Sequence, residues 1–493
     1  MHKNNLRVVT ISKRLERGFI SLSAILALTA IQRAWVHPSG GHTHRQADTI
    51  GMSIAFAEQV RERGIAAFDF LLYPRILQKG VFDGINVAEF PLLNVAGGPG
   101  FLFSSSPLAG VILTIILILS LNLWVAYRDL PTLLKSWGVR VSPSLGLALW
   151  LTSSTIGSQT SVIMPEGVAL PLVVSGMARI ITANQRAYQL ALGILLCNLG
   201  IAVKPTAAIA LGAIAFLPFV FKNLRPKAPE ILACTVLSLV FPAWWYTLHA
   251  KDIVSFAQGP QIFALAAFHP FDKLGELGLR DFLFLLGRET CCGQYPFYFG
   301  WFFIGTALAL KEWLLVLIYF LSLLAAIALD GGHIFAHAYY FIGSSIFAMI
   351  LMARVLGALE NRKRLKTITL ILLTWGVLYT IRGNLWVWSV DSQYWQRNYW
   401  SMGTEARTMI DDRAHIITDD GQYPLKLLFI GRSGSHRHDG TYRACNEPQF
   451  LRRPLTFVSD TPPPVQPFCG TRRIERKQVK TGFAIWYVTL VQE

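Results

Sequence analysis

Long apolar runs recur along the first 383 residues of the chain and alternate with shorter polar segments. About eleven of these runs approach the length of roughly 20 residues that an α-helix needs to cross a bilayer. The pattern therefore predicts a polytopic α-helical membrane protein. The predicted spans are 19–36, 107–127, 141–158, 167–183, 187–203, 206–221, 231–249, 297–310, 313–329, 338–357 and 367–383.

Composition and charge support this class. Of all residues, 53% are hydrophobic and 15% are charged, whereas a soluble domain carries roughly 25% charged residues. Lys and Arg exceed Asp and Glu, which gives a net charge of +16. This excess lies mostly in the segments that the predicted spans put on the same side of the membrane as the N-terminus. Basic loops mark the cytoplasmic side, so an odd number of spans puts the C-terminus outside. No soluble basic domain precedes the membrane part, and nucleic-acid binding is therefore not expected.

The N-terminus is basic, and the apolar run that follows continues to Trp35 without a small-residue cleavage site, which predicts a signal anchor. Three outer segments exceed the length of simple connectors: 37–106, 250–296 and 384–493. We expect two domains, a transmembrane domain at 1–383 and an extracytoplasmic domain at 384–493. In the latter, short strands at "AHIITDD", "LKLLFIG" and "FAIWYVTLV", separated by turn residues, predict a small α/β fold.

The chain has six cysteines. Cys197 and Cys234 lie inside apolar runs and are expected to be packing residues. Cys291 and Cys292 are adjacent in a predicted loop, and adjacent cysteines rarely bond each other. Cys445 and Cys469 lie in the C-terminal region, where a disulfide is expected if that region is extracytoplasmic.

A polar stretch, "GHTHRQADTIGMSIAFAEQ" at residues 41–59, follows the first predicted span. Apolar residues at helical spacing beyond Asp48 predict an amphipathic helix along the outer interface. Asp48 stands at the start of this helix, where it suits an N-cap as well as a catalytic carboxylate. His42, His44 and Asp48 match no recognised metal-ligand spacing, and Arg45 also suits a lipid headgroup contact.

Further ionisable residues map to the same predicted side of the membrane. Glu166 lies at the outer mouth of the fourth span, and Lys204 at the outer end of the fifth. Each residue alone is explained by interfacial anchoring, but acids and cations gathered at membrane depth are costly and usually functional. This mixture suits a reaction in which a phosphate is neutralised and a hydroxyl is activated. The other members are Arg75, Glu89, His337, Tyr339 and Tyr340.

Six short motifs occur in the order "HTHRQADT", "LYPR", "EFP", "MPE", "KPT" and "HAYY". The motifs and their order resemble those of bacterial membrane glycosyltransferases that are similar to the dolichyl-phosphate-mannose–protein mannosyltransferases. These enzymes are members of the GT-C superfamily. The segment "HIITDDGQYPLKLLFIGRSG" is similar to the outer domain of such enzymes. Thr43-His44 stands where the family has Ser-Trp, and Ala338 stands where an acidic residue is usual. These departures leave the sugar and the acceptor open.

The resemblance implies an inverting transfer of a sugar from a polyprenyl-phosphate carrier to a glycan, lipid or protein acceptor, at the outer face of the bacterial cytoplasmic membrane. It gives Asp48 the role of general base, and the chemistry assigns the phosphate to Arg75 and Lys204. No cofactor is expected, although metal dependence varies among related folds. The remaining predicted substrate-binding residues are His44, Arg45, Gln46, Glu89, Glu166, His337, Tyr339 and Tyr340.

Two other classes of function remain as alternatives. A secondary transporter or flippase of lipid-linked sugars would show inverted repeats and broken helices with charges at the membrane midplane, and the sequence shows neither. A non-catalytic membrane scaffold would leave the gathering of acids and cations unexplained. No phosphate-binding glycine loop precedes a helix, so nucleotide binding is not expected.

Overall fold

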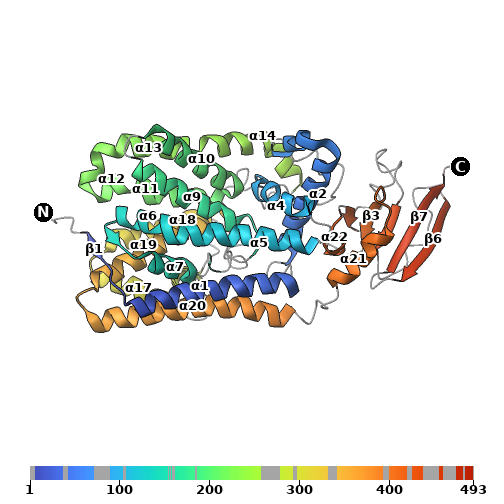
Figure 1. Ribbon diagram of the computed structural model, residues 1–493. Helices are drawn as coiled ribbons and strands as arrows, with labels where there is room; N and C mark the ends of the chain where they lie inside the picture. The colour runs from blue at the N-terminus through green and yellow to red at the C-terminus, as the bar shows by residue number, and fades with distance from the viewer. Residues whose placement is uncertain are drawn as a thin grey trace. The chain divides into compact units, whose positions relative to one another are not determined.

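The computed structural model divides into two compact units (Figure 1). The first unit comprises Met1–Ala30, Leu117–Ser161 and Pro165–Trp386, and the second comprises Ile31–Ile116, Val162–Met164 and Val387–Glu493. Each unit is described by itself. The structure describes residues 6–36, 43–71, 89–103, 107–153, 155, 157, 162–183, 186–256, 278–291, 297–330, 341–391, 399–418, 425–432, 434–436, 455–458, 473–480 and 484–491.

The first unit is built from helices, with one short parallel pair of strands, β1 (Arg7–Val8) and β2 (Val139–Arg140). A π-helix, η2 (Val125–Asp129), and two 3-10 helices, η3 (Pro205–Leu211) and η4 (Lys222–Lys227), interrupt the α-helices. Helices α1, α5 and α20 each have residues in both units. The α-helices are α1 (Lys13–Val36), α5 (Pro107–Trp124), α6 (Leu130–Ser136), α7 (Pro143–Thr152), α9 (Glu166–Thr182), α10 (Ala187–Val203), α11 (Gly212–Ala215), α12 (Leu217–Val220), α13 (Ala228–Leu237), α14 (Val240–Phe256), α16 (Leu279–Thr290), α17 (Phe297–Ala309), α18 (Trp313–Asp330), α19 (Ile342–Ala358) and α20 (Lys363–Asp391).

Within the described part of the chain, four helical stretches are long and apolar enough to cross a membrane: Lys13–Gln32, Pro107–Ser136, Lys222–His249 and Lys363–Arg382. Further apolar helices of 10–17 residues accompany them. The chain is thus mainly helical and apolar, as a multi-pass membrane protein should be. The expected total of eleven spans stays a prediction.

Helices α9 and α10 are antiparallel neighbours (Figure 1, green) and approach each other through glycines. A Cβ added to Gly176 would lie 2.5 Å from the carbonyl oxygen of Gly193, and one added to Gly200 would lie 2.6 Å from that of Ala169. Both distances are too short for a side chain, so these positions require glycine. Small residues of this kind let membrane helices pack backbone to backbone. The close packing fixes the end of α9 relative to the end of α10.

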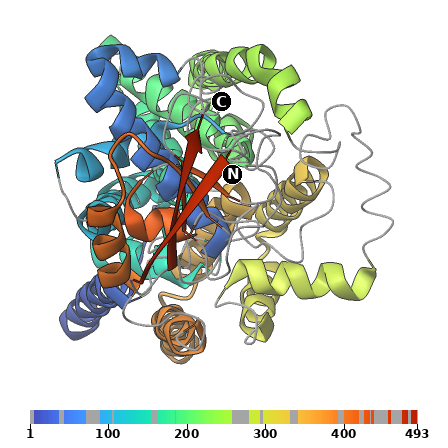
Figure 2. The same ribbon diagram turned by 90° about the vertical axis from the view of Figure 1, so that its right-hand side faces the viewer.

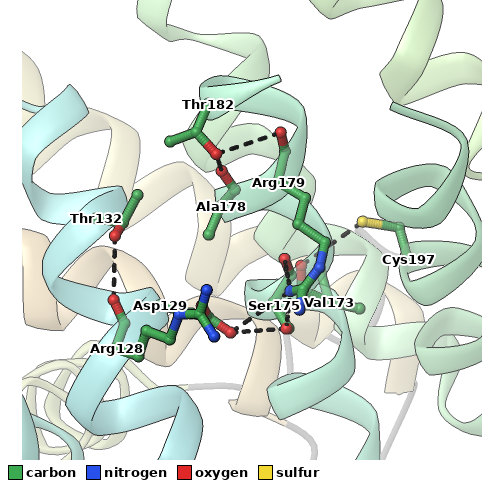
Figure 3. Close-up of polar contacts among 9 residues, drawn as sticks. All are labelled: Arg128, Asp129, Thr132, Val173, Ser175, Ala178, Arg179, Thr182 and Cys197. Atoms are coloured by element: carbon green, nitrogen blue, oxygen red, sulfur yellow. Dashed lines mark hydrogen bonds and ion pairs between the residues drawn. The ribbon is translucent and has the colours of Figure 1, made fainter. Parts of the chain in front are cut away.

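A polar cluster holds the C-terminal half of α9 (Figure 3). The Ser175 hydroxyl donates to Asp129 Oδ2 at 2.7 Å, and Arg179 Nη1 lies 3.7 Å from the same carboxylate oxygen. Arg179 Nη1 also donates to the carbonyl oxygen of Ser175 at 3.0 Å. Asp129 ends the π-helix η2 and is buried. The cluster therefore anchors α9 to η2 at the end of α9 that is remote from Glu166.

The second unit combines helices with a five-stranded sheet of order β4-β3-β5-β7-β6. Strand β3 runs parallel to β4 and β5, and β7 is antiparallel to β5 and β6. The two longest strands, β6 and β7, are the red arrows of Figure 2. The elements are α2 (Thr43–Arg63), η1 (Gly64–Leu71), α4 (Leu92–Leu102), α21 (Tyr399–Met409), β3 (His415–Thr418), α22 (Leu425–Ile430), β4 (Gly434–His436), β5 (Leu455–Val458), β6 (Arg473–Lys480) and β7 (Ala484–Val491).

One hydrophobic core joins α2 to the C-terminal elements of the second unit. Met52, Ala55 and Phe56 of α2 pack with Ile416 of β3 and Leu427 of α22. An ion pair also joins α2 to the C-terminal elements, because Arg432 Nε lies 3.3 Å from Glu58 Oε1. The helix that carries the first sequence motif and the C-terminal elements therefore belong to one packed body.

Arginines gather beside this contact. Arg61 donates to the carbonyl oxygen of Phe101 at 2.6 Å, and Arg407 donates to that of Gly431 at 3.3 Å. Burial, together with the positive charges of Arg432 and Arg61, lowers the pKa of Arg407. Carbonyl oxygens at the ends of α4 and α22 thus accept hydrogen bonds from Arg61 and Arg407, respectively.

Two local predictions are wrong. The segment 425–430 is the helix α22 rather than a strand. A short apolar run fits either structure, and in the helix Leu427 is buried in the hydrophobic core. Helix α2 begins at Thr43, and Asp48 is therefore inside the helix rather than at its N-cap. The predicted strands at 414–420 and 483–491 are confirmed as β3 and β7.

Candidate functional site

A buried ion pair joins the ends of α9 and α10 in the first unit. Lys204 Nζ lies 2.8 Å from Glu166 Oε1, and the side chains are 6% and 0% exposed, respectively. Glu166 is the first residue of α9, and Lys204 is the residue that caps the C-terminus of α10. A helix dipole favours an anion at its N-terminus and a cation at its C-terminus. Both charges therefore occupy the helix ends that stabilise them.

The burial of this ion pair makes it a candidate functional site, because removing charges from water costs free energy. Removing an isolated charge from water costs several kcal/mol, and buried charges are therefore usually kept only where they are paired. Ionisable pairs within a membrane protein commonly mark a pathway or a catalytic centre. The sequence predicted that Glu166 and Lys204 lie on the same side, and it did not predict that they touch.

Polar groups of α14 lie beside the same end of α10. The Tyr246 hydroxyl donates to the carbonyl oxygen of Ala202 at 2.8 Å. One turn later, His249 is buried, and its ring centroid lies 4.7 Å from that of Trp245. The sequence analysis missed His249. Its only signal was a histidine inside an otherwise apolar helix, and such a residue usually has a packing role.

A second buried polar group lies elsewhere in the first unit. Arg288 Nε lies 2.7 Å from Glu289 Oε1, and the Thr155 hydroxyl donates to Glu289 Oε2. The Thr290 hydroxyl is 3.1 Å from the Tyr319 hydroxyl. These residues were also missed, although the charged "RET" that ends the apolar run 282–287 was a visible signal. Their contacts join segments as far as 134 residues apart.

Helix α2 of the second unit carries the "HRQAD" motif, and two hydrogen bonds fix it. Gln46 Oε1 accepts from the backbone amide of Ile163 at 2.9 Å, and the Asn94 amide donates to the carbonyl oxygen of Thr49 at 2.8 Å. Gln46 is 1% exposed. Asp48 lies between these two anchored positions, in the second turn of α2. The backbone that presents Asp48 is therefore held on both sides.

The other predicted site residues are placed less fully. His44 and Arg45 lie in the first turn of α2, and Glu89 is half-buried just before α4. Arg75, His337, Tyr339 and Tyr340 fall outside the described residues. No group of three His, Cys, Asp or Glu side chains able to hold a metal ion occurs among the residues that the structure describes.

The structure describes three of the six cysteines. Cys197 and Cys234 are free and buried, which confirms their predicted packing role. Cys291 is disulfide-bonded, and Cys292 lies outside the described residues. Cys445 and Cys469 lie outside the described residues.

The fold is similar to that of ArnT from Cupriavidus metallidurans. The likeness to ArnT bound to undecaprenyl phosphate has a TM-score of 0.52 at 10% identity and covers 95% of this chain and 98% of that chain. The likeness to apo ArnT has the same TM-score, 0.52, at 11% identity over 96% and 98%. These values establish a shared fold, and they confirm at that level the resemblance found in the sequence motifs.

A weaker likeness was found to the archaeal oligosaccharyltransferase AglB from Archaeoglobus fulgidus, in complex with an inhibitory peptide and a dolichol-phosphate. Its TM-score is 0.45 at 12% identity, over 91% of this chain and 70% of that chain. Neither the protein-family models nor the curated protein sequences gave a match.

Proposed function

We propose that the protein is a membrane glycosyltransferase that moves a sugar from a polyprenyl-phosphate carrier to a hydroxyl group of a glycan, lipid or protein. The observation that carries the proposal is the buried pair of Glu166 and Lys204 at the ends of α9 and α10. It is supported by the fold shared with ArnT, which was solved with undecaprenyl phosphate bound. We place the reaction at the outer face of a bacterial cytoplasmic membrane, with residues 384–493 on the same side.

The reaction breaks the bond between the anomeric carbon and the phosphate oxygen of the donor. The acceptor oxygen forms a new bond to that carbon and gives its proton to a base, while polyprenyl phosphate leaves with the bonding electrons. A single displacement of this kind inverts the anomeric configuration. Catalysis therefore needs a base for the acceptor and positive charge for the leaving phosphate.

Asp48 is proposed as the base, on the strength of its motif and of the anchoring of α2 on either side of it. Lys204 is proposed to stabilise the leaving phosphate, together with Arg75. Glu166 holds the Lys204 ammonium in place in the absence of donor, and it suits a sugar hydroxyl once the phosphate has taken over the lysine. Glu89, His44, Arg45, His337, Tyr339 and Tyr340 are proposed to bind sugar or acceptor groups.

The class of donor is the most direct test. Purified protein in nanodiscs is supplied with membrane extract as the source of acceptor and with a radiolabelled sugar, carried either by polyprenyl phosphate or by a nucleoside diphosphate. Label should enter the acceptor fraction only from the polyprenyl-phosphate donor, with release of polyprenyl phosphate. Lys204→Met should reduce this transfer, whereas the control Lys222→Met, at an exposed lysine of η4, should not.

The flippase alternative predicts a different result. In sealed vesicles, a flippase would move the lipid-linked sugar across the bilayer and leave the bond between sugar and phosphate intact. Movement without cleavage, or transfer from the nucleotide sugar alone, would contradict the proposed function.

A further inference from the structure

Thr206 carries a buried hydroxyl that is unpaired within the described part of the chain. The residue is 6% exposed, and no hydrogen-bond partner of its Oγ1 occurs among the residues that the structure describes. Other buried hydroxyls of the same unit are paired: Thr152 donates to Ala148 at 2.6 Å, and Ser344 donates to Ser322 at 3.0 Å. A buried polar group left unpaired costs about 1–3 kcal/mol. Within the part of the chain that the structure describes, the Thr206 hydroxyl is therefore suited to a bound ligand that accepts a hydrogen bond.

The position of this hydroxyl points to the kind of partner. Thr206 follows Lys204 by two residues, and both lie in a turn closed by a hydrogen bond of 3.0 Å from the Ala207 amide to the Lys204 carbonyl oxygen. Pro205, between them, fixes its own backbone torsion and has no amide hydrogen to offer. A cation and a free hydroxyl donor thus share one short, rigid turn.

The N-terminus of α19 packs directly against this turn. A Cβ added to Gly343 would lie 2.2 Å from the carbonyl oxygen of Thr206, so only glycine allows this approach. Phe341, the N-cap residue, makes no side-chain hydrogen bond to the helix. The first amides of a helix, together with its dipole, favour an anion. Thr206 thus lies near the N-terminal end of a helix as well as beside the buried ion pair of Lys204 and Glu166.

We propose that the Thr206 hydroxyl donates a hydrogen bond to a non-bridging phosphate oxygen of the polyprenyl-phosphate donor, beside Lys204. The inference rests on the proposed function and names a further residue of its donor site. A hydroxyl can donate both to the phosphodiester of the donor and to the more highly charged phosphate that leaves. Bonds to charged acceptors are the stronger ones, so this hydroxyl favours the charge that develops in the transfer.

Thr206→Val tests the proposal, because valine keeps the shape and removes only the hydroxyl. The probe is binding of undecaprenyl phosphate to the full-length protein in nanodiscs, with undecaprenol as the phosphate-free comparison. Thr206→Val should weaken binding of undecaprenyl phosphate about tenfold or more, the size of one bond to a charged group. It should leave undecaprenol binding unchanged, and Thr206→Ser should bind like the wild type.

Thermal unfolding without ligand is a second measurement. If the Thr206 hydroxyl had a structural role, its removal would lower the unfolding temperature. Removing an unpaired buried hydroxyl should leave the unfolding temperature of Thr206→Val unchanged or raised. The matched control, Thr152→Val, removes a paired hydroxyl, so it should lower the unfolding temperature without changing the affinity for undecaprenyl phosphate.

The outcomes separate this inference from the proposed function. If Lys204→Met weakens binding of undecaprenyl phosphate and Thr206→Val does not, the role of Thr206 is refuted and the proposed function stands. A loss of stability in Thr206→Val like that of the control would also refute it. If the wild type does not prefer undecaprenyl phosphate to undecaprenol, the proposed function itself fails.

Discussion

The side-chain oxygen of Gln46 accepts a hydrogen bond of 2.9 Å from the backbone amide of Ile163, which lies 117 residues further along the chain. Both residues are almost fully buried. Gln46 was predicted to bind substrate, and that prediction stays open. The contact gives its side chain a further task, because it fixes the first turn of the helix that carries Asp48.

Gln46→Leu should destabilise the second unit. Leucine removes the acceptor and leaves the Ile163 amide buried without its partner, at a cost of about 1–3 kcal/mol. Denaturant titration of the purified protein measures this loss. Gln59→Leu, at a partly exposed position of the same helix, is the matched control and should change stability little. Equal stability of the two variants would show that the Gln46 contact contributes nothing.

The ion pair of Glu166 and Lys204 predicts strong coupling between substitutions. Glu166→Gln or Lys204→Met leaves the other charge buried without its counterion, and each should cost about 3–5 kcal/mol. The double variant should recover part of this loss, because neither charge remains. A double-mutant cycle of unfolding free energies measures the coupling. Additive losses would mean that the two charges do not depend on each other.

The sequence predicted the features that depend on local pattern. Apolar runs showed where helices such as α9, α10 and α19 form, and a short apolar run between turn residues predicted the strand β7. It could not separate helix from strand in the six residues of α22, because so short an apolar run has no readable period.

Contacts between distant segments could not be predicted, because they produce no local pattern in the sequence. Glu166 and Lys204 were expected on one side of the membrane, but their pairing depends on the glycines that bring α9 against α10. The bond between Thr155 and Glu289 spans 134 residues, and the charged residues that end the apolar run 282–287 gave no indication of this partner. Residues 331–340, which hold His337 and both predicted tyrosines, lie outside the described part, so their roles stay predictions.

Cys291 should be oxidised in protein isolated from the membrane. Within the described part of the chain Cys291 is disulfide-bonded, whereas Cys197 and Cys234 are free. Peptide mapping without reductant should find Cys291 in a disulfide and the two buried cysteines as thiols. The same mapping tests the predicted bond between Cys445 and Cys469. A free thiol at position 291 would contradict the structure here.

The C-terminal residues 384–493 should lie outside the cytoplasm. The basic segments on the N-terminal side of the membrane predict this, and a disulfide at Cys291 accords with an oxidising compartment for the segment 250–296. A reporter that is active only in the cytoplasm should be silent when fused after Glu493 and active when inserted after Arg225. A strong signal from the C-terminal fusion would place the proposed reaction on the wrong side.

The turnover of Asp48→Asn tests the central claim most directly. Asp48 lies inside α2, and Asn and Asp have similar helix propensities, so the variant should fold. Asn cannot accept the acceptor's proton, and sugar transfer should fall roughly 10²–10⁴-fold, the usual contribution of a general base. Affinity for the polyprenyl-phosphate donor should stay near that of the wild type. Asp69→Asn, in η1 of the same unit, is the control and should transfer sugar normally. The account predicts lost turnover with retained donor binding, and a folded Asp48→Asn protein with normal turnover would contradict it.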